Sequence, residues 1–138
     1  MDWEEQLSQA GWRITTPRRV VMQVLEQAAR PLSPQEIHAR GHRLHRSLGL
    51  VSVYRALAAL ERAGLVRRVH REDRCNSYVL ASPGHHHLLL CRRCGRTVEF
   101  PGTEDLSSLI AQVEQQTGFR VEDHLLQLVG LCAPCRNL

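Results

Sequence analysis

Two pairs of cysteines place the strongest constraint on the fold of this chain: Cys91 with Cys94, and Cys132 with Cys135. Each Cys-x-x-Cys pair can present two sulfurs from one tight turn. Two such pairs can surround a tetrahedral zinc ion, whose bonds to thiolate sulfur are roughly 2.3 Å long. A site of this kind has no open coordination position, so it would hold the fold together and would neither catalyse nor sense. The sequence therefore predicts a structural zinc ion at the four cysteines, with disulfides as the alternative.

The cellular compartment decides between zinc and disulfides, because cysteines stay reduced in the cytoplasm and pair in secreted proteins. No apolar run in the 138 residues is long enough to span a bilayer. Residues 1–5 are acidic, whereas a secretory signal begins with basic residues. We therefore expect a cytoplasmic chain with no membrane partner, in which the cysteines bind zinc.

Positive charge is concentrated in the first part of the chain. Residues 11–83 contain thirteen arginines and five acidic residues, a net charge of +8, whereas residues 84–138 contain five arginines and six acidic residues, a net charge of −1. Such an asymmetry is typical of a nucleic-acid-binding part joined to a part with another role. The alternative is a small helical domain with a solvated arginine face.

Helices are predicted in the basic part by their capping residues, after a short helix over residues 3–10. Thr16 before Pro17 predicts the start of one helix, because threonine caps helices and proline suits their first turn. Residues 33–36, Ser-Pro-Gln-Glu, form a capping box that predicts the start of the next. Ile37 and Leu44 are expected on the buried face of this second helix.

A third helix and a hairpin complete the predicted N-terminal fold. Ser52 is expected to cap this helix, and Gly64 to end it. Residues 65–69 and 76–81 are predicted strands, joined by a charged turn over residues 71–74. Three helices followed by a hairpin form a winged helix-turn-helix, in which the last helix enters the major groove of double-stranded DNA.

The remaining residues predict a second, smaller domain. Residues 82–84, Ser-Pro-Gly, indicate a hinge, so we expect a DNA-binding domain over residues 1–81 and a dimerisation domain over residues 85–138. The whole chain is predicted to have an α+β fold. The expected strands of the second domain are residues 87–90, 97–100 and 120–131, and its expected helix is residues 103–116, with an apolar stripe at Leu106, Leu109, Ile110 and Val113. A domain of this size buries little apolar surface. Zinc and a partner subunit would therefore both stabilise it.

A set of motifs spread over residues 11–135 carries a resemblance to a known family. The motifs are Gly11–Arg18, Val51–Leu57, Leu60, Ala63–Val66, His85–His87, Cys91, Cys94, Gly95, Val98–Phe100, Gly118, Phe119, His124, Gly130–Cys132 and Cys135. Taken together they resemble the ferric uptake regulator family, and more closely its zinc-sensing branch. The resemblance implies a homodimeric bacterial repressor that binds palindromic operators when a regulatory site holds a divalent metal.

The same resemblance implies which side chains contact DNA. Tyr54 and Arg55 would face the major groove from the third predicted helix, together with Ser52. Arg13 would reach into a minor groove, where the narrow A·T channel attracts a guanidinium group. The alternatives are a rim position for Tyr54 and a solvated charge for Arg13.

Three adjacent histidines predict the regulatory site. In a strand, His85 and His87 point to one face and His86 to the other, because side chains alternate. With His124, the first two match three positions of a site that zinc-sensing members build from three histidines and a glutamate. Three imidazoles and one carboxylate suit zinc, whereas iron(II) or manganese(II), the alternatives, usually bind more oxygen atoms.

The fourth ligand is harder to assign from sequence. By resemblance, it lies on the helix that follows the first cysteine pair. Glu104 and Asp105 are the carboxylates available there, and we select Glu104. An ungapped match to the family instead puts Leu106 or Ser107 at the position of the carboxylate.

A second family site, near the hinge, has lost expected ligands. Leu88 stands where a histidine would be expected, and Arg67 where another ligand would follow the third helix. His86 and Glu99 remain as candidates, and the unpaired Cys75 could join them. The alternative for Cys75 is a small buried side chain.

Other functions compete with zinc-dependent repression. Within the family, the chain could respond to iron or to peroxide, although few carboxylates lie near the histidines. From another class, His85, His87 and His124 could form an open zinc site of a hydrolase, with Glu104 or Glu99 as the base. Zinc storage would predict metal binding without DNA binding.

Overall fold

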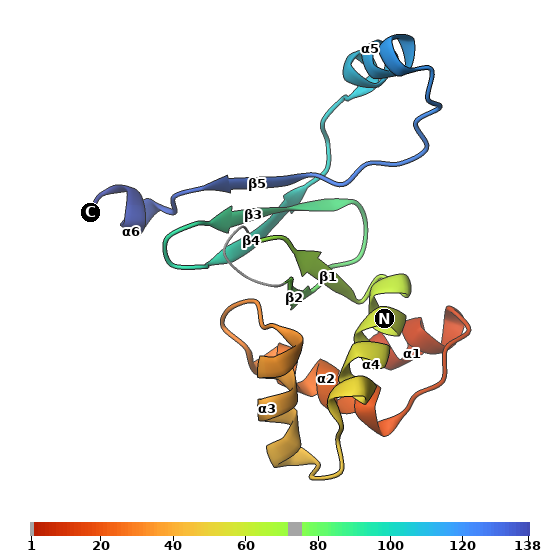
Figure 1. Ribbon diagram of the computed structural model, residues 1–138, viewed down its shortest axis with the longest axis vertical. Helices are drawn as coiled ribbons and strands as arrows, with labels where there is room; N and C mark the ends of the chain where they lie inside the picture. The colour runs from red at the N-terminus through yellow and green to blue at the C-terminus, as the bar shows by residue number, and fades with distance from the viewer. Residues whose placement is uncertain (1, 72–75) are drawn as a thin grey trace.

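The computed structural model describes residues 2–71 and 76–138, and these form helices and two small sheets (Figure 1). The elements are α1 (Trp3–Gln9), α2 (Thr16–Gln27), α3 (Pro34–Leu44), α4 (Leu50–Arg62), β1 (Val66–Val69), β2 (Ser77–Leu80), β3 (His86–Cys91), β4 (Thr97–Pro101), α5 (Ser107–Thr117), β5 (Gln127–Gly130) and α6 (Ala133–Arg136). The predicted α+β fold class is confirmed. Within the described residues, no helix is both long and apolar enough to cross a membrane.

The starts of α2 and α4 correct two predicted caps. Thr15, not Thr16, caps α2: its hydroxyl accepts a hydrogen bond from the backbone N–H of Arg18 at 3.3 Å. Thr16 is instead the first residue of the helix, which starts one residue earlier than predicted. The two consecutive threonines offer equivalent caps, and proline also fits the second helical position. The predicted cap at Ser52 is wrong: α4 begins at Leu50 after Gly49, so Ser52 lies inside its first turn.

The capping box of α3 is confirmed, but part of its predicted buried face is wrong. The backbone N–H of Glu36 donates to Ser33 Oγ, and the Glu36 carboxylate accepts from the Ser33 N–H, both at 3.1 Å. Ile37 is fully buried, whereas Leu44 is 50% exposed. Gly41 takes the interior position instead, because the Leu48 side chain folds back over the helix there.

The hairpin packs onto the helices in one core. β1 and β2 are antiparallel, with Val66 opposite Leu80 and Val69 opposite Ser77, as predicted to within one residue at each end. The backbone of Leu32, just before α3, forms a further bridge with Tyr78 on β2. Val66, Tyr78 and Leu80 of the hairpin therefore share one hydrophobic cluster with apolar residues of α2, α3 and α4.

The C-terminal part is a three-stranded sheet in the order β4-β3-β5. β3 is antiparallel to β4 and parallel to β5, and Leu88 lies opposite Gln127 in the parallel pair. The predicted strand over residues 120–131 is wrong in its first half, because only Gln127–Gly130 pairs with β3 and residues 120–126 have no neighbouring strand. The predicted helix starts later than expected, at Ser107.

An apolar stripe of α5 has no cover in the described chain. Figure 1 shows this helix at the end of an excursion between β4 and β5, away from the sheet. No residue of α5 is buried; Leu109 is 55% exposed, and Val129 on β5 is 58% exposed. Leu109 and Val113, four residues apart on α5, are exposed on one face of the helix, which is typical of an interaction site.

Candidate metal centre

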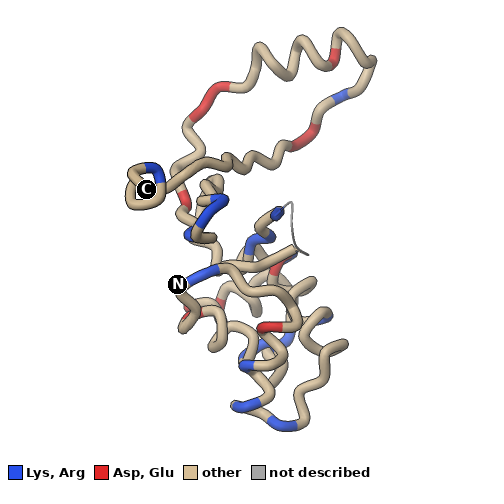
Figure 2. Tube along the Cα trace, turned by 60° about the vertical axis from the view of Figure 1, so that its left-hand side comes forward, with Lys and Arg blue, Asp and Glu red and all other residues tan. Residues whose placement is uncertain are grey.

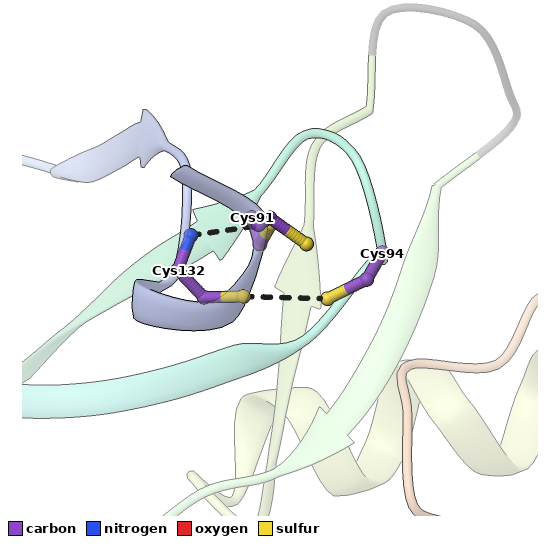
Figure 3. A group of neighbouring side chains, drawn as sticks. Cys91, Cys94 and Cys132 are labelled. Carbon is purple, nitrogen blue, oxygen red and sulfur yellow. Dashed lines mark hydrogen bonds between the residues drawn. The ribbon is translucent and has the colours of Figure 1, made fainter. Parts of the chain in front are cut away.

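The four cysteines converge at one end of the sheet, and Figure 3 shows three of them, Cys91, Cys94 and Cys132. Cys91 ends β3, Cys94 lies in the following turn, and Cys132 and Cys135 belong to the start and body of α6. Their four sulfurs all lie within 4.8 Å of one another, and Cys94 Sγ is 3.7 Å from Cys132 Sγ. Zinc–sulfur bonds of roughly 2.3 Å require about 3.8 Å between sulfurs at tetrahedral corners. The residues therefore fit a zinc ion, and all four are free of disulfides.

Electrostatics at the cysteines also favour a cation. Backbone N–H groups of Cys94 and then of Cys132 lower the pKa of Cys91 to about 5, and the Cys132 N–H lies 3.4 Å from Cys91 Sγ. In contrast, hydrogen bonding to Cys132, followed by burial, raises the pKa of Cys135 to about 12. Without a cation the sulfurs therefore cannot all be thiolates together. A divalent ion among them would remove that conflict.

The predicted histidines and a glutamate form a second cluster. His85 directly precedes β3, His87 lies on it, Glu104 precedes α5, and His124 precedes β5. One nitrogen or oxygen of each lies within 4.8 Å of the others. The structure thus brings together the four residues selected from the sequence, although their alignment to the family left the carboxylate open.

Three distances in this cluster are close to those of a tetrahedral metal site. His85 Nε2 is 3.3 Å from His124 Nε2, and Glu104 Oε1 is 3.6 Å from the first nitrogen and 3.4 Å from the second. His87 Nε2 contacts the same carboxylate oxygen. Zinc bonds of roughly 2.0–2.1 Å require about 3.3–3.4 Å between ligand atoms. The donor set of three imidazoles and one carboxylate therefore fits a divalent ion.

Burial and charge divide the cluster into a fixed and an open side. His87 is only 3% exposed, with its ring 5.6 Å from that of Phe100, whereas the His85 side chain is 52% exposed. The pKa of Glu104 is lowered, first by its own backbone N–H and then by His87, so its side chain is an anion at neutral pH. An ion could therefore enter past His85 and meet a preformed carboxylate.

Glu104 occupies this position because of the way that α5 begins. The predicted helix over residues 103–116 would have included Glu104, but α5 starts at Ser107, so Glu104 lies in the loop before it. Asp105, the other candidate, accepts a hydrogen bond from the Ser107 N–H at 2.9 Å and so stabilises the helix start. The loop before α5 is thereby left free to carry Glu104 to the histidines.

Gly102 is a residue of this site that sequence reasoning missed. A Cβ atom at Gly102 would lie 2.0 Å from His85 Cδ2, and the Gly102 N–H donates to the His85 carbonyl at 2.8 Å. The Pro101-Gly102 pair signals a turn, but a turn signal alone does not reveal that an imidazole lies over the glycine. Gly102 thus provides the space that His85 occupies.

The residues of the second predicted site are only partly together. His86 faces away from the histidine cluster, as predicted, and its Nδ1 lies 4.0 Å from Glu99 Oε2. Leu88 is buried, and the guanidinium of Arg67 donates to the His86 carbonyl. Cys75 lies outside the described residues. In the part of the chain that the structure describes, His86 and Glu99 belong to no group of three or more ligands.

The predicted DNA-contacting residues lie on the surface of the N-terminal part. Tyr54 and Arg55 are exposed on α4, and the Tyr54 hydroxyl accepts a hydrogen bond from the Gln35 amide at 3.1 Å. Ser52 is half-buried on the same helix, and Arg13 is exposed between α1 and α2. Figure 2 shows most of the arginines on this part of the molecule and acidic residues along the segment between β4 and β5.

Known proteins share both the sequence and the fold. The profile described as "Ferric uptake regulator family" matches residues 9–129. The chain is 34% identical over 137 residues to the ferric uptake regulation protein of Legionella pneumophila, covering 99% of this chain and 100% of the relative. It is also 34% identical over 131 residues to the zinc uptake regulation protein of Mycobacterium tuberculosis (strain CDC 1551 / Oshkosh), covering 95% and 100%.

A solved structure extends this similarity to three dimensions. The fold matches that of a zinc uptake regulator complexed with zinc and DNA, with a TM-score of 0.74 and 26% identity, over 99% of this chain and 97% of the other. Members of the matched family are transcription regulators and not enzymes. The predicted resemblance to the ferric uptake regulator family is therefore confirmed: the chain belongs to this family and is a metal-responsive, DNA-binding transcription regulator.

Proposed function

We propose that the chain is a zinc-responsive repressor that binds a palindromic operator as a homodimer. The observation that carries this proposal is the convergence of three imidazole nitrogens and one carboxylate oxygen within 4.8 Å of one another. In this proposal His85, His87, Glu104 and His124 are the regulatory ligands. Cys91, Cys94, Cys132 and Cys135 hold a structural zinc ion.

The choice of zinc follows from the donor set. Three nitrogens and one oxygen suit zinc, whereas iron(II) and manganese(II) favour sites richer in oxygen. A ferric uptake regulation protein and a zinc uptake regulation protein are both 34% identical to this chain. The choice of metal therefore depends on the ligand atoms and not on the similarity to these relatives. Iron-responsive repression is the second candidate.

The domain organisation would convert metal binding into DNA binding. We divide the chain into a winged helix-turn-helix domain over residues 1–81, a hinge over 82–84 and a dimerisation domain over 85–138. A bound divalent ion would supply positive charge at the point where the three imidazole rings and the carboxylate converge. The ligands join the N-terminal ends of β3 and β5 to the loop before α5, so the occupied site orders the sheet next to the hinge. Regulation is then a shift of population toward the DNA-competent arrangement.

Dimerisation would use the exposed apolar surface of the C-terminal part. Leu109 and Val113 on α5, together with Leu128 and Val129 on β5, are all 36% exposed or more. A second copy would cover these side chains and place two α4 helices at a set distance. Two half-sites one helical turn apart, roughly 34–36 Å, require such a distance.

Each α4 helix would then read one half of the operator. Tyr54, Arg55 and Ser52 would face the major groove, and Arg13 would enter a neighbouring minor groove. The exposure of Arg13, Tyr54 and Arg55 on the arginine-rich part supports this assignment. A regulator of this kind works in the cytoplasm, where its DNA and a buffered metal pool are both present.

The proposal is tested by measuring metal content and DNA binding together. An operator is first selected from random DNA, with the protein saturated with zinc. Fluorescence anisotropy then gives operator affinity at buffered free zinc, iron(II) and manganese(II), and elemental analysis gives metals per protomer. We expect two zinc ions per protomer and operator binding that requires the second. Operator affinity that follows iron(II) and ignores zinc would establish the second candidate instead, and affinity that is independent of every metal would refute both.

A further inference from the structure

The β1–β2 hairpin is tied to the C-terminal sheet by one glutamine side chain. Gln127 Oε1 accepts from the His70 backbone N–H at 2.9 Å, and Gln127 Nε2 donates to the His70 carbonyl at 2.8 Å. His70 directly follows β1, and Gln127 is the first residue of β5. One amide group therefore satisfies both backbone groups of a residue in the DNA-binding half, as a neighbouring strand would.

Apolar contacts lie directly beside this tie. Val69 from β1 is fully buried against Leu88 and Leu90 from β3, with Val79 from β2 packed on the same cluster. This second hydrophobic cluster is separate from the main core and contains side chains from both halves of the chain. Leu88 also lies opposite Gln127 in the sheet. The hydrogen bonds from Gln127 to His70 and the apolar cluster around Leu88 are therefore adjacent.

The groups at this junction do not fit a metal ion. The guanidinium of Arg67 reaches the His86 carbonyl, and an arginine is a permanent cation with no lone pair to offer. Leu88 has no ligand atom at all. Among the described residues, His86 and Glu99 are two donors where zinc uses three or four protein ligands, and both carboxylate oxygens of Glu99 already accept from the Ser82 N–H, at 3.1 and 3.3 Å.

The junction is also the place where the histidine–glutamate cluster meets the hairpin. His87 directly precedes Leu88 on β3, and His124 lies three residues before Gln127. Two of the cluster's residues therefore lie close in sequence to the Leu88–Gln127 pair, His87 on β3 and His124 before β5. A cavity of about 830 Å³ lies between the hairpin and this end of the sheet, and its lining includes His70, Leu88 and Gln127.

We propose that Gln127, Arg67 and Leu88 form a metal-free joint in the place of a second metal site, and that Gln127 is the positioning residue that transmits the metal state of the histidine–glutamate cluster to the hairpin. This inference rests on the proposed regulatory role of that cluster. Ligand binding at His87 and His124 holds the ends of β3 and β5 together, and this fixes Gln127 against His70. The orientation of the DNA-binding half is then set by protein contacts and governed by one regulatory ion per protomer.

The test replaces the amide while keeping the length of the side chain. Gln127→Met removes both hydrogen bonds to His70 and retains an unbranched stem. Gln23→Met, at an exposed position on α2, is the matched control. For the full-length wild type and both variants, elemental analysis gives metals per protomer, and competition with a zinc chelator gives the affinity of the second zinc. Anisotropy gives operator affinity with one and with two zinc ions bound.

We expect two zinc ions per protomer in all three proteins. In the wild type and in Gln23→Met, the second zinc should raise operator affinity by a common factor. In Gln127→Met that factor should fall by about fivefold or more, the lower end of usual allosteric couplings. By reciprocity, operator DNA should also lose most of its effect on the affinity for the second zinc in this variant.

Hydrogen exchange provides a readout that a general loss of stability would not reproduce. In the wild type, the second zinc should slow exchange at residues 66–71, and in Gln127→Met it should not, while exchange in α2 and α4 stays the same in both proteins. A third metal in the wild type would overturn the metal-free joint. An unchanged affinity factor and unchanged zinc-dependent protection in Gln127→Met would overturn the role of Gln127. If the wild type itself shows no zinc dependence, the proposed function fails and this inference fails with it.

Discussion

Gly102→Ala provides a direct test of how the regulatory cluster is positioned. The new Cβ would lie 2.0 Å from His85 Cδ2 and 2.6 Å from His85 Nε2, far inside van der Waals contact. The hydrogen bond from the Gly102 N–H to the His85 carbonyl, 2.8 Å long, keeps the two backbones together. The imidazole must therefore swing away, and its nitrogen leaves the other three ligands.

The structure also indicates the size of the effect. Ordinary contact requires about 3.4 Å or more between such atoms, so the ring must move by more than an ångström, and a metal bond does not tolerate that displacement. Loss of a residue that merely orients a ligand costs about 10–100-fold in metal affinity. We expect at least this loss for the second zinc. Thermal stability of the metal-free protein should change by less than about 1 kcal/mol, because the half-exposed ring can move into solvent and Gly102 has no positive φ.

The measurement is a zinc titration against a chelator of known affinity, combined with thermal unfolding of metal-free protein. Gly49→Ala is the control, because a Cβ there meets no atom within 4 Å. This control should bind the second zinc as the wild type does. Wild-type affinity for the second zinc in Gly102→Ala would refute the argument that His85 depends on the space above Gly102.

Three further predictions concern the regulatory cluster, the DNA-binding surface and the core. Glu104→Gln should weaken binding of the second zinc in a chelator competition at pH values from about 5.5 to about 7.5, because the pKa of Glu104 is lowered below its ordinary 4.5 and its carboxylate is therefore ionised throughout this range. Arg55→Ala should reduce operator affinity by about 1–3 kcal/mol with zinc content unchanged, as measured by anisotropy, and a wild-type affinity would remove Arg55 from the DNA interface. Ile37→Ala should lower the free energy of unfolding by about 2–5 kcal/mol in urea, because the side chain is fully buried in the N-terminal core, whereas Leu44→Ala, at a half-exposed position, should cost far less.

Local signals in the sequence were sufficient for most elements. The capping box at residues 33–36 and the hairpin were predicted closely, because their determinants lie within a few residues of one another. Errors arose where neighbouring residues offered equal alternatives. Thr15 and Thr16 could each cap α2, and Ser52 is a good capping residue that lies one turn inside α4.

The sequence by itself determined which ligands were available: two Cys-x-x-Cys pairs, and histidines that alternation divides between two faces of a strand. Family likeness then indicated their use. Tertiary structure alone decided that Glu104 and not Asp105 joins the histidines, that Gly102 makes room for His85, and that Gln127 binds the backbone of His70, 57 positions away. The reason is physical: periodicity and capping act between near neighbours, whereas contacts between distant segments depend on sheet register and on where each loop leaves its strand.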